Sequence, residues 1–157
     1  MVTPGGKQTE IAALVLEARF LHHRDGNDKK VIRICDRILA MDGHNRDALL
    51  IKAGALGGLR RETECLRLTE DIIREWPGHW EGYYLLALHL FNADEQKALE
   101  LLKKSIGLTE KFDNLIAIAQ LAYFAGKEDY LAYLAKAEAL DPPRYRNYME
   151  HFWSYEV

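Results

Sequence analysis

The stretch 64-ECLRLTEDIIREWPGHWEGYYLLALHLF-91 decides how this chain folds. A run with apolar residues three and four positions apart ends at Trp76-Pro77-Gly78, and a strongly apolar run starts at Trp80. Spacings of three and four are the helical period, and Pro77 cannot continue a helix because it lacks the backbone N–H donor. The stretch therefore predicts two helices that meet at a sharp break.

The same pattern recurs along the chain. A large, a small and a mostly large residue, spaced four and three, occur at Leu14-Ala18-Leu21, Leu49-Ala53-Leu56, Tyr83-Ala87-Leu90 and Leu115-Ala119-Ala122. A second set with the same spacing follows each first one, at Val31-Cys35-Ile38, Cys65-Thr69-Ile72, Ala98-Leu102-Ser105 and Tyr130-Leu134-Ala137. Each unit closes at Gly43, Pro77, Glu110 or Pro142, at intervals of 34, 33 and 32 residues. The sequence thus predicts four helix hairpins in a row.

A period near 34 residues, with two helices per period and a closing proline, resembles the tetratricopeptide repeat. The best instances are residues 40–59, 74–91 and 137–143. The resemblance implies an all-α fold, a right-handed α-solenoid of four hairpins plus a C-terminal capping helix. The expected boundaries are a flexible leader over 1–8, an array over 9–143 and an aromatic helix over 144–157. Within the array, the repeats are expected at about 11–45, 46–79, 80–111 and 112–143.

Two further expectations follow from the hairpins. The turns inside them should lie near 23–30, 57–62, 92–95 and 126–129. The small residues of the first helices should be buried, because they let the partner helix approach closely.

The C-terminal helix offers two interpretations. Tyr145, Tyr148, Met149, Phe152 and Tyr155 share one of its faces, which suits a cap on the last apolar face of an array. Five of the sixteen aromatic residues of the chain lie in its last thirteen positions, which is rich for a cap. The alternative is that this helix packs in a neighbouring subunit.

Composition limits the function classes. The chain has 157 residues, 48% of them hydrophobic and 29% charged, with a net charge of -3. This charge disfavours a nucleic-acid surface. No apolar run reaches the roughly 18 residues of a membrane span, and the first ten residues do not form a secretory signal. A cytoplasmic setting is the default, with the two cysteines, Cys35 and Cys65, buried in second helices.

The chain shows no motif for chemistry. The segment 54-GALGGLR-60 lacks the Lys-Ser/Thr of a phosphate loop, and two cysteines 30 residues apart give no zinc framework. We therefore expect no enzyme activity, no cofactor and no metal.

The family resemblance also implies a working surface, a concave groove lined by first helices that binds peptides. Carried over to this sequence, the groove residues are Arg19, His22, Leu50, Gly54, Tyr84, Leu88, Phe91, Ile116, Gln120 and Tyr123. The Lys and Asn with which some members clamp a terminal carboxylate are replaced by Val15 and Arg19, which argues against that type of co-chaperone. Glycines at positions 54, 57 and 58 would leave room for a close backbone.

The expected function is a non-enzymatic protein–protein interaction module, an adaptor that binds an apolar or amphipathic segment of a protein or peptide partner. The alternative is a self-assembling scaffold, a homo-oligomer in which the C-terminal aromatic helix fills a neighbour's groove. The fold analogy carries most of this expectation.

Overall fold

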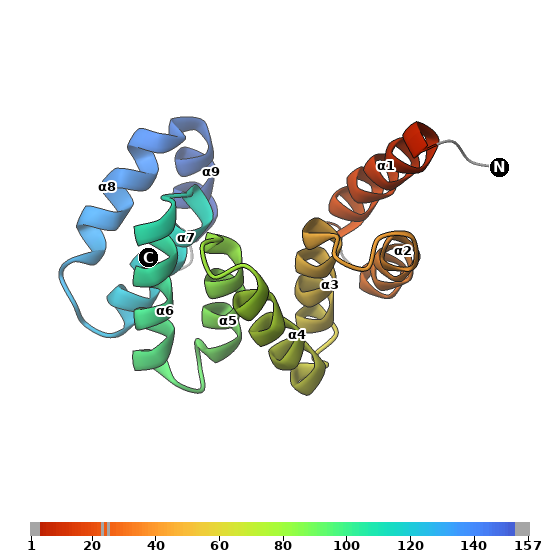
Figure 1. The fold of residues 1–157 in the computed structure, drawn as a ribbon. Helices are drawn as coiled ribbons and strands as arrows, with labels where there is room; N and C mark the ends of the chain where they lie inside the picture. The colour runs from red at the N-terminus through yellow and green to blue at the C-terminus, as the bar shows by residue number, and fades with distance from the viewer. Residues whose placement is uncertain (1–3, 23, 25, 153–157) are drawn as a thin grey trace. The chain divides into compact units, whose positions relative to one another are not determined.

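A computed structural model describes residues 4–22, 24 and 26–152 (Figure 1). In this part of the chain the regular elements are all helices. They are α1 Pro4–His22, α2 Asp28–Met41, α3 Arg46–Gly58, α4 Glu62–Glu75, α5 Trp80–Leu90, α6 Glu95–Leu108, α7 Phe112–Phe124, α8 Tyr130–Leu140 and α9 Pro142–Phe152. The predicted all-α fold class is therefore confirmed.

The chain divides into two compact units. Unit 1 is Met1–Pro77 and contains α1 to α4, and unit 2 is Gly78–Val157 and contains α5 to α9. The division falls inside the Trp76-Pro77-Gly78 break. Each unit has its own core and is described by itself.

The helices pack as hairpins within each unit. In unit 1, α1 packs on α2 and α3, α2 on α3, and α3 on α4; in unit 2, each helix from α5 to α8 packs on the next one in the chain. Inside the hairpins, the helices end and restart at His22 and Asp28, Gly58 and Glu62, Leu90 and Glu95, and Phe124 and Tyr130. These bounds agree with the four predicted turns.

The beginning of the chain differs from the expected boundary. The flexible leader was expected over 1–8, but α1 already starts at Pro4, and the Thr9 hydroxyl donates to the carbonyl oxygen of Gly5 at 2.9 Å. The buried Ile11 and Leu14 hold this helix against its neighbours. Residues 1–3 lie outside the described part, as does Tyr155 of the aromatic face.

Small residues at the helix contacts let the hairpins close. Ala18, Ala53, Ala87 and Ala119 are at most 2% exposed, as the repeat pattern predicts. In unit 1, the Cys65 thiol donates to the carbonyl oxygen of Ala53 at 3.3 Å, which places α4 directly on α3. A larger residue at position 53 would push these two helices apart.

A buried polar network fastens the turn between α6 and α7. Asn114 donates from Nδ2 to Ser105 Oγ at 3.1 Å and to the carbonyl oxygen of Thr109 at 2.8 Å, and its Oδ1 accepts from the backbone N–H of Lys111 at 2.9 Å. Ser105 in turn donates to the carbonyl oxygen of Trp80 at 3.0 Å, at the start of α5. Ser105 and Asn114 are both fully buried. This network lies at the end of the third repeat, where Glu110 stands in place of the Gly or Pro that ends the other repeats.

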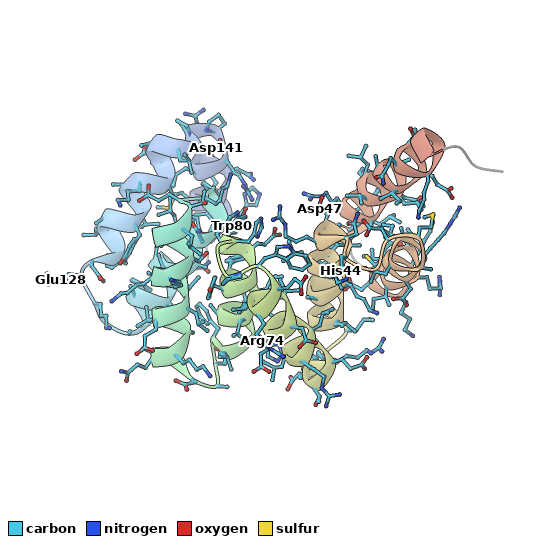
Figure 2. All side chains as sticks on the ribbon, in the orientation of Figure 1. His44, Asp47, Arg74, Trp80, Glu128 and Asp141 are labelled. Atoms are coloured by element: carbon cyan, nitrogen blue, oxygen red, sulfur yellow. The ribbon has the colours of Figure 1, made fainter. Side chains whose placement is uncertain are left out.

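The C-terminal helix packs on its own chain. Asp141 ends α8 and accepts from the backbone N–H of Arg144 at 3.1 Å, which caps the start of α9 (Figure 2). Tyr145 and Tyr148 pack against the cluster that contains Phe112 and Leu115. The face predicted for a cap is therefore used within unit 2.

Candidate functional site

In unit 1 the predicted groove positions of α1 make polar contacts with aspartates of the neighbouring helices. Arg19 Nη2 lies 2.8 Å from Asp47 Oδ1, at the start of α3 (Figure 2). His22 Nδ1 lies 3.3 Å from Asp28 Oδ1, at the first residue of α2. The contacts join α1 to α3 and to α2, so both side chains already have partners within unit 1.

Two glycines of α3 leave room for the side chains of His22 and Asp28. A Cβ added at Gly54 would lie 2.7 Å from His22 Nε2, and one added at Gly58 would overlap the carboxylate of Asp28. The space that the sequence suggested for a close partner backbone is thus filled at these two positions by the chain's own His22 and Asp28. The fourth predicted position in unit 1, Leu50, is only 3% exposed and lies in the core.

Unit 2 brings four of its six predicted groove residues to one place. Tyr84 and Leu88 of α5 and Ile116 and Gln120 of α7 line a hollow of about 460 Å³. The remaining lining residues are Phe112, Asp113 and Ala117 of α7 and Arg144, Asn147, Tyr148 and His151 of α9. The groove positions of two first helices therefore form two walls, and the C-terminal helix forms a third.

The apolar part of the hollow comes from α5 and α7. Leu88 is 41% exposed there, next to the nearly buried Ile116. Burial raises the pKa of Tyr84 to about 12, and the nearby carboxylate of Asp113 adds to the rise. Tyr84 is therefore a neutral group at physiological pH, an apolar ring with a hydroxyl for hydrogen bonding.

The wall from α9 is polar and is tied to α7. Arg144 places Nη2 at 2.6 Å and Nη1 at 3.4 Å from the two carboxylate oxygens of Asp113, while its guanidinium carbon lies 4.5 Å from the ring centre of Phe112. Gln120 Nε2 donates to the Tyr148 hydroxyl at 3.0 Å. These contacts hold α9 beside the hollow and leave the space between the walls open.

Two predicted groove residues lie elsewhere. Phe91 caps the C-terminal end of α5 and packs, half-buried, against the cluster of Ala87 and Leu121. The Tyr123 ring packs edge-on against Tyr130 of α8, with 5.2 Å between the ring centres. Neither residue lines the hollow, because Phe91 packs into a cluster of α5, α6 and α7 residues and Tyr123 packs against α8.

The contribution of α9 to the hollow was not predicted from the sequence. Arg144, Asn147, Tyr148 and His151 follow one another at spacings of three, one and three, which places them on one helical face. This polar face was readable from the sequence, but the aromatic residues of the same helix dominated the interpretation. His151 donates from Nδ1 to the carbonyl oxygen of Asn147 at 2.7 Å, which fixes its ring along the helix.

The described residues contain no group of three or more His, Cys, Asp or Glu placed to hold a metal ion. Cys35 and Cys65 are buried and not bonded to each other, as expected for second-helix positions. Burial raises the pKa of Cys35 to about 11, so its thiol is a poor nucleophile near neutral pH. No helix in the described ranges combines the length and the apolar character needed to span a bilayer.

Comparison with known proteins gives structural likenesses only. Neither a family model nor a curated protein matches this sequence. A thermophilic TPR protein from Thermus thermophilus aligns with a TM-score of 0.72 at 19% identity, over 89% of this chain and 77% of that one. Residues 41 to the end of MamA from Desulfovibrio magneticus RS-1 align with a TM-score of 0.63 at 17% identity, over 85% and 76%.

A crystal structure of MamA also aligns with a TM-score of 0.62 at 20% identity, over 97% of this chain and 82% of that one. At such identities a likeness shows the fold. The hairpin periods, the buried alanines and these neighbours agree, and the chain has the tetratricopeptide-repeat fold, four helix hairpins followed by a C-terminal helix.

Proposed function

We propose that this protein is a non-enzymatic interaction module that binds an apolar or amphipathic segment of a protein partner in the hollow of unit 2. The observation that carries the proposal is the hollow itself, about 460 Å³ between α5, α7 and α9. Its volume lies within the roughly 300–1,000 Å³ of ordinary binding sites. An exposed leucine beside polar rim groups is the combination such sites use for affinity and orientation.

The chemistry of the walls indicates what the partner should bring. Leu88 and Ile116 offer apolar surface to one or more apolar side chains. Gln120 and Asn147, from opposite walls, carry amide groups that can donate to or accept from a partner backbone. Arg144 is already paired with Asp113, so the net charge of the hollow is small and binding should depend weakly on salt.

The residues in unit 1 are a weaker candidate for contact with a partner. Leu50 is buried, and Arg19 and His22 are engaged with Asp47 and Asp28. The self-assembly alternative, with the C-terminal helix inserted in a neighbour, has less support, because Tyr145 and Tyr148 already pack within unit 2.

The test is to select peptides from a displayed random library on the intact chain and to measure their affinity for two variants. Leu88→Lys places a charge in the hollow, while Leu140→Lys makes the same change at a leucine of α8 that is 53% exposed and does not line it. We expect peptides rich in apolar residues, with affinity reduced about tenfold or more by Leu88→Lys, which is about 1.4 kcal/mol, and unchanged by Leu140→Lys. Equal affinity for both variants would contradict the proposal.

A further inference from the structure

A second apolar surface lies on α1, on the side away from the core of unit 1. Leu16 and Phe20 are 69% and 62% exposed and stand four positions apart, on the same face of the helix. The neighbouring exposed residues Ala12 and Ala13 are too short to shield them. An exposed apolar stripe of this kind on a helix is typical of a contact surface.

A cation accompanies this stripe. The guanidinium carbon of Arg24 lies 5.1 Å from the ring centre of Phe20. Within the described part of the chain, no carboxylate forms an ion pair with Arg24. The surface therefore presents an aromatic ring with a positive charge over it, at the end of α1.

Unit 2 has an apolar groove with one negative charge, which complements the apolar and positively charged surface of α1. A depression of about 340 Å³ between α8 and α9 is lined by Tyr130, Leu131, Leu134, Ala135, Glu138, Tyr145 and Met149. Leu131 is 60% exposed, and the carboxylate of Glu138 forms no ion pair with another described residue. The groove therefore offers apolar walls and one negative charge.

We propose that these two surfaces bind each other between two copies of this chain. Phe20 and Leu16 of one copy enter the α8–α9 groove of the next, and Arg24 meets the carboxylate of Glu138. The volume of the groove suits one or two large side chains, and the charges have opposite sign. The contact goes beyond the proposed function, because it uses none of the residues that line the peptide hollow.

The contact is head-to-tail, since the two surfaces are different. It also differs from an exchange of the C-terminal helix, because α9 stays on its own chain and only shapes the groove. A stripe of two large side chains falls short of the roughly 800 Å² per partner of a standard interface, so the association should be weak.

The experiment measures sedimentation velocity from about 10 μM to about 1 mM, the range in which a weak interface associates. We expect the sedimentation coefficient of the unmodified chain to rise with concentration. Phe20→Glu and Leu131→Glu should each abolish the rise, because each removes one of the two surfaces. Phe124→Glu, a matched change at a phenylalanine that is 61% exposed and belongs to neither surface, should leave it unchanged.

Mixing gives the decisive result. The Phe20→Glu chain keeps its groove and the Leu131→Glu chain keeps its stripe, so an equimolar mixture should form dimers and nothing larger. Combining Arg24→Glu with Glu138→Arg in one chain should likewise restore the association that each single change weakens. A chain that stays monomeric at about 1 mM, or a mixture that stays monomeric, would overturn the proposal. So would a Leu131→Glu chain that still self-associates, since that would mean a symmetric contact of α1 with α1.

Discussion

The strongest test of the fold is the buried network around Asn114. Replacing Asn114 with alanine removes three hydrogen bonds at once, two donated by Nδ2 and one accepted by Oδ1. Each hydrogen bond contributes about 0.5–1.5 kcal/mol net, and a buried partner that is left without a hydrogen bond adds a desolvation cost. Because Ser105 is completely buried while water can reach the turn at Thr109 and Lys111, we expect a loss of about 2–4 kcal/mol in the free energy of unfolding.

Urea denaturation followed by circular dichroism measures this change. With a slope of about 2 kcal/mol per molar urea, the midpoint should fall by about 1–2 M. The loss should appear in the transition of unit 2, since Trp80, Ser105 and Asn114 all belong to it. Asn92→Ala, at an exposed asparagine of the α5–α6 turn, is the matched control and should change stability by less than about 0.5 kcal/mol.

A second substitution separates hydrogen bonding from packing. Asn114→Asp keeps the acceptor for the Lys111 N–H but loses both donated bonds, and it places a carboxylate against the carbonyl oxygen of Thr109. It should therefore destabilise at least as much as alanine. A cost below about 1 kcal/mol for Asn114→Ala, or a fully stable Asn114→Asp protein, would refute the reasoning.

Four more predictions test other parts of the structure. Ala87→Leu should overpack the contact of α5 with α6 and lower the free energy of unfolding by about 1–3 kcal/mol in urea titrations. Gly107→Ala, where an added Cβ meets nothing within 4 Å, should raise the free energy of unfolding by up to about 1 kcal/mol. The Gly58→Ala protein should be at least about 1 kcal/mol less stable than the Gly107→Ala protein, because the added Cβ would overlap the carboxylate of Asp28. Burial raises the pKa of Tyr84 to about 12, so the neutral phenol favours the folded state. This contribution to stability is complete below the unfolded pKa of about 10 and is lost as the pH rises to about 12. In thermal melts between these two pH values, the Tyr84→Phe protein should lose less stability than the unmodified chain. The buried Cys35 thiol, with a pKa of about 11, should react with a thiol reagent at pH 8 much more slowly in the folded than in the urea-unfolded chain, and equal rates would place it at the surface.

The sequence predicted the helices and their inward faces because these depend on local rules. Spacings of three and four fix which side of a helix is apolar, and they correctly identified the buried alanines Ala53 and Ala87. The break at Trp76-Pro77-Gly78 was also readable from the residues. That the break separates two compact units was not, because it depends on tertiary packing inside each unit.

The candidate site was less predictable because exposure depends on the neighbours of a helix. Phe91 and Leu88 both occupy groove positions in the repeat pattern, yet only Leu88 lines the hollow. The space beside Gly54 is filled by His22, which lies 32 positions earlier in the sequence. The third wall comes from α9, which lies outside the repeat period. Such contacts follow from tertiary packing, and a single sequence carries little trace of them.

The local character of the packing has a consequence for folding. Nearly all helix pairs in contact are successive along the chain, with α1 and α3 the added pair. Short sequence separations mean low contact order and little loop entropy to overcome before native contacts form. Within each unit, a hairpin can therefore form early from residues that are close in the sequence, and the neighbouring helix can then pack on it.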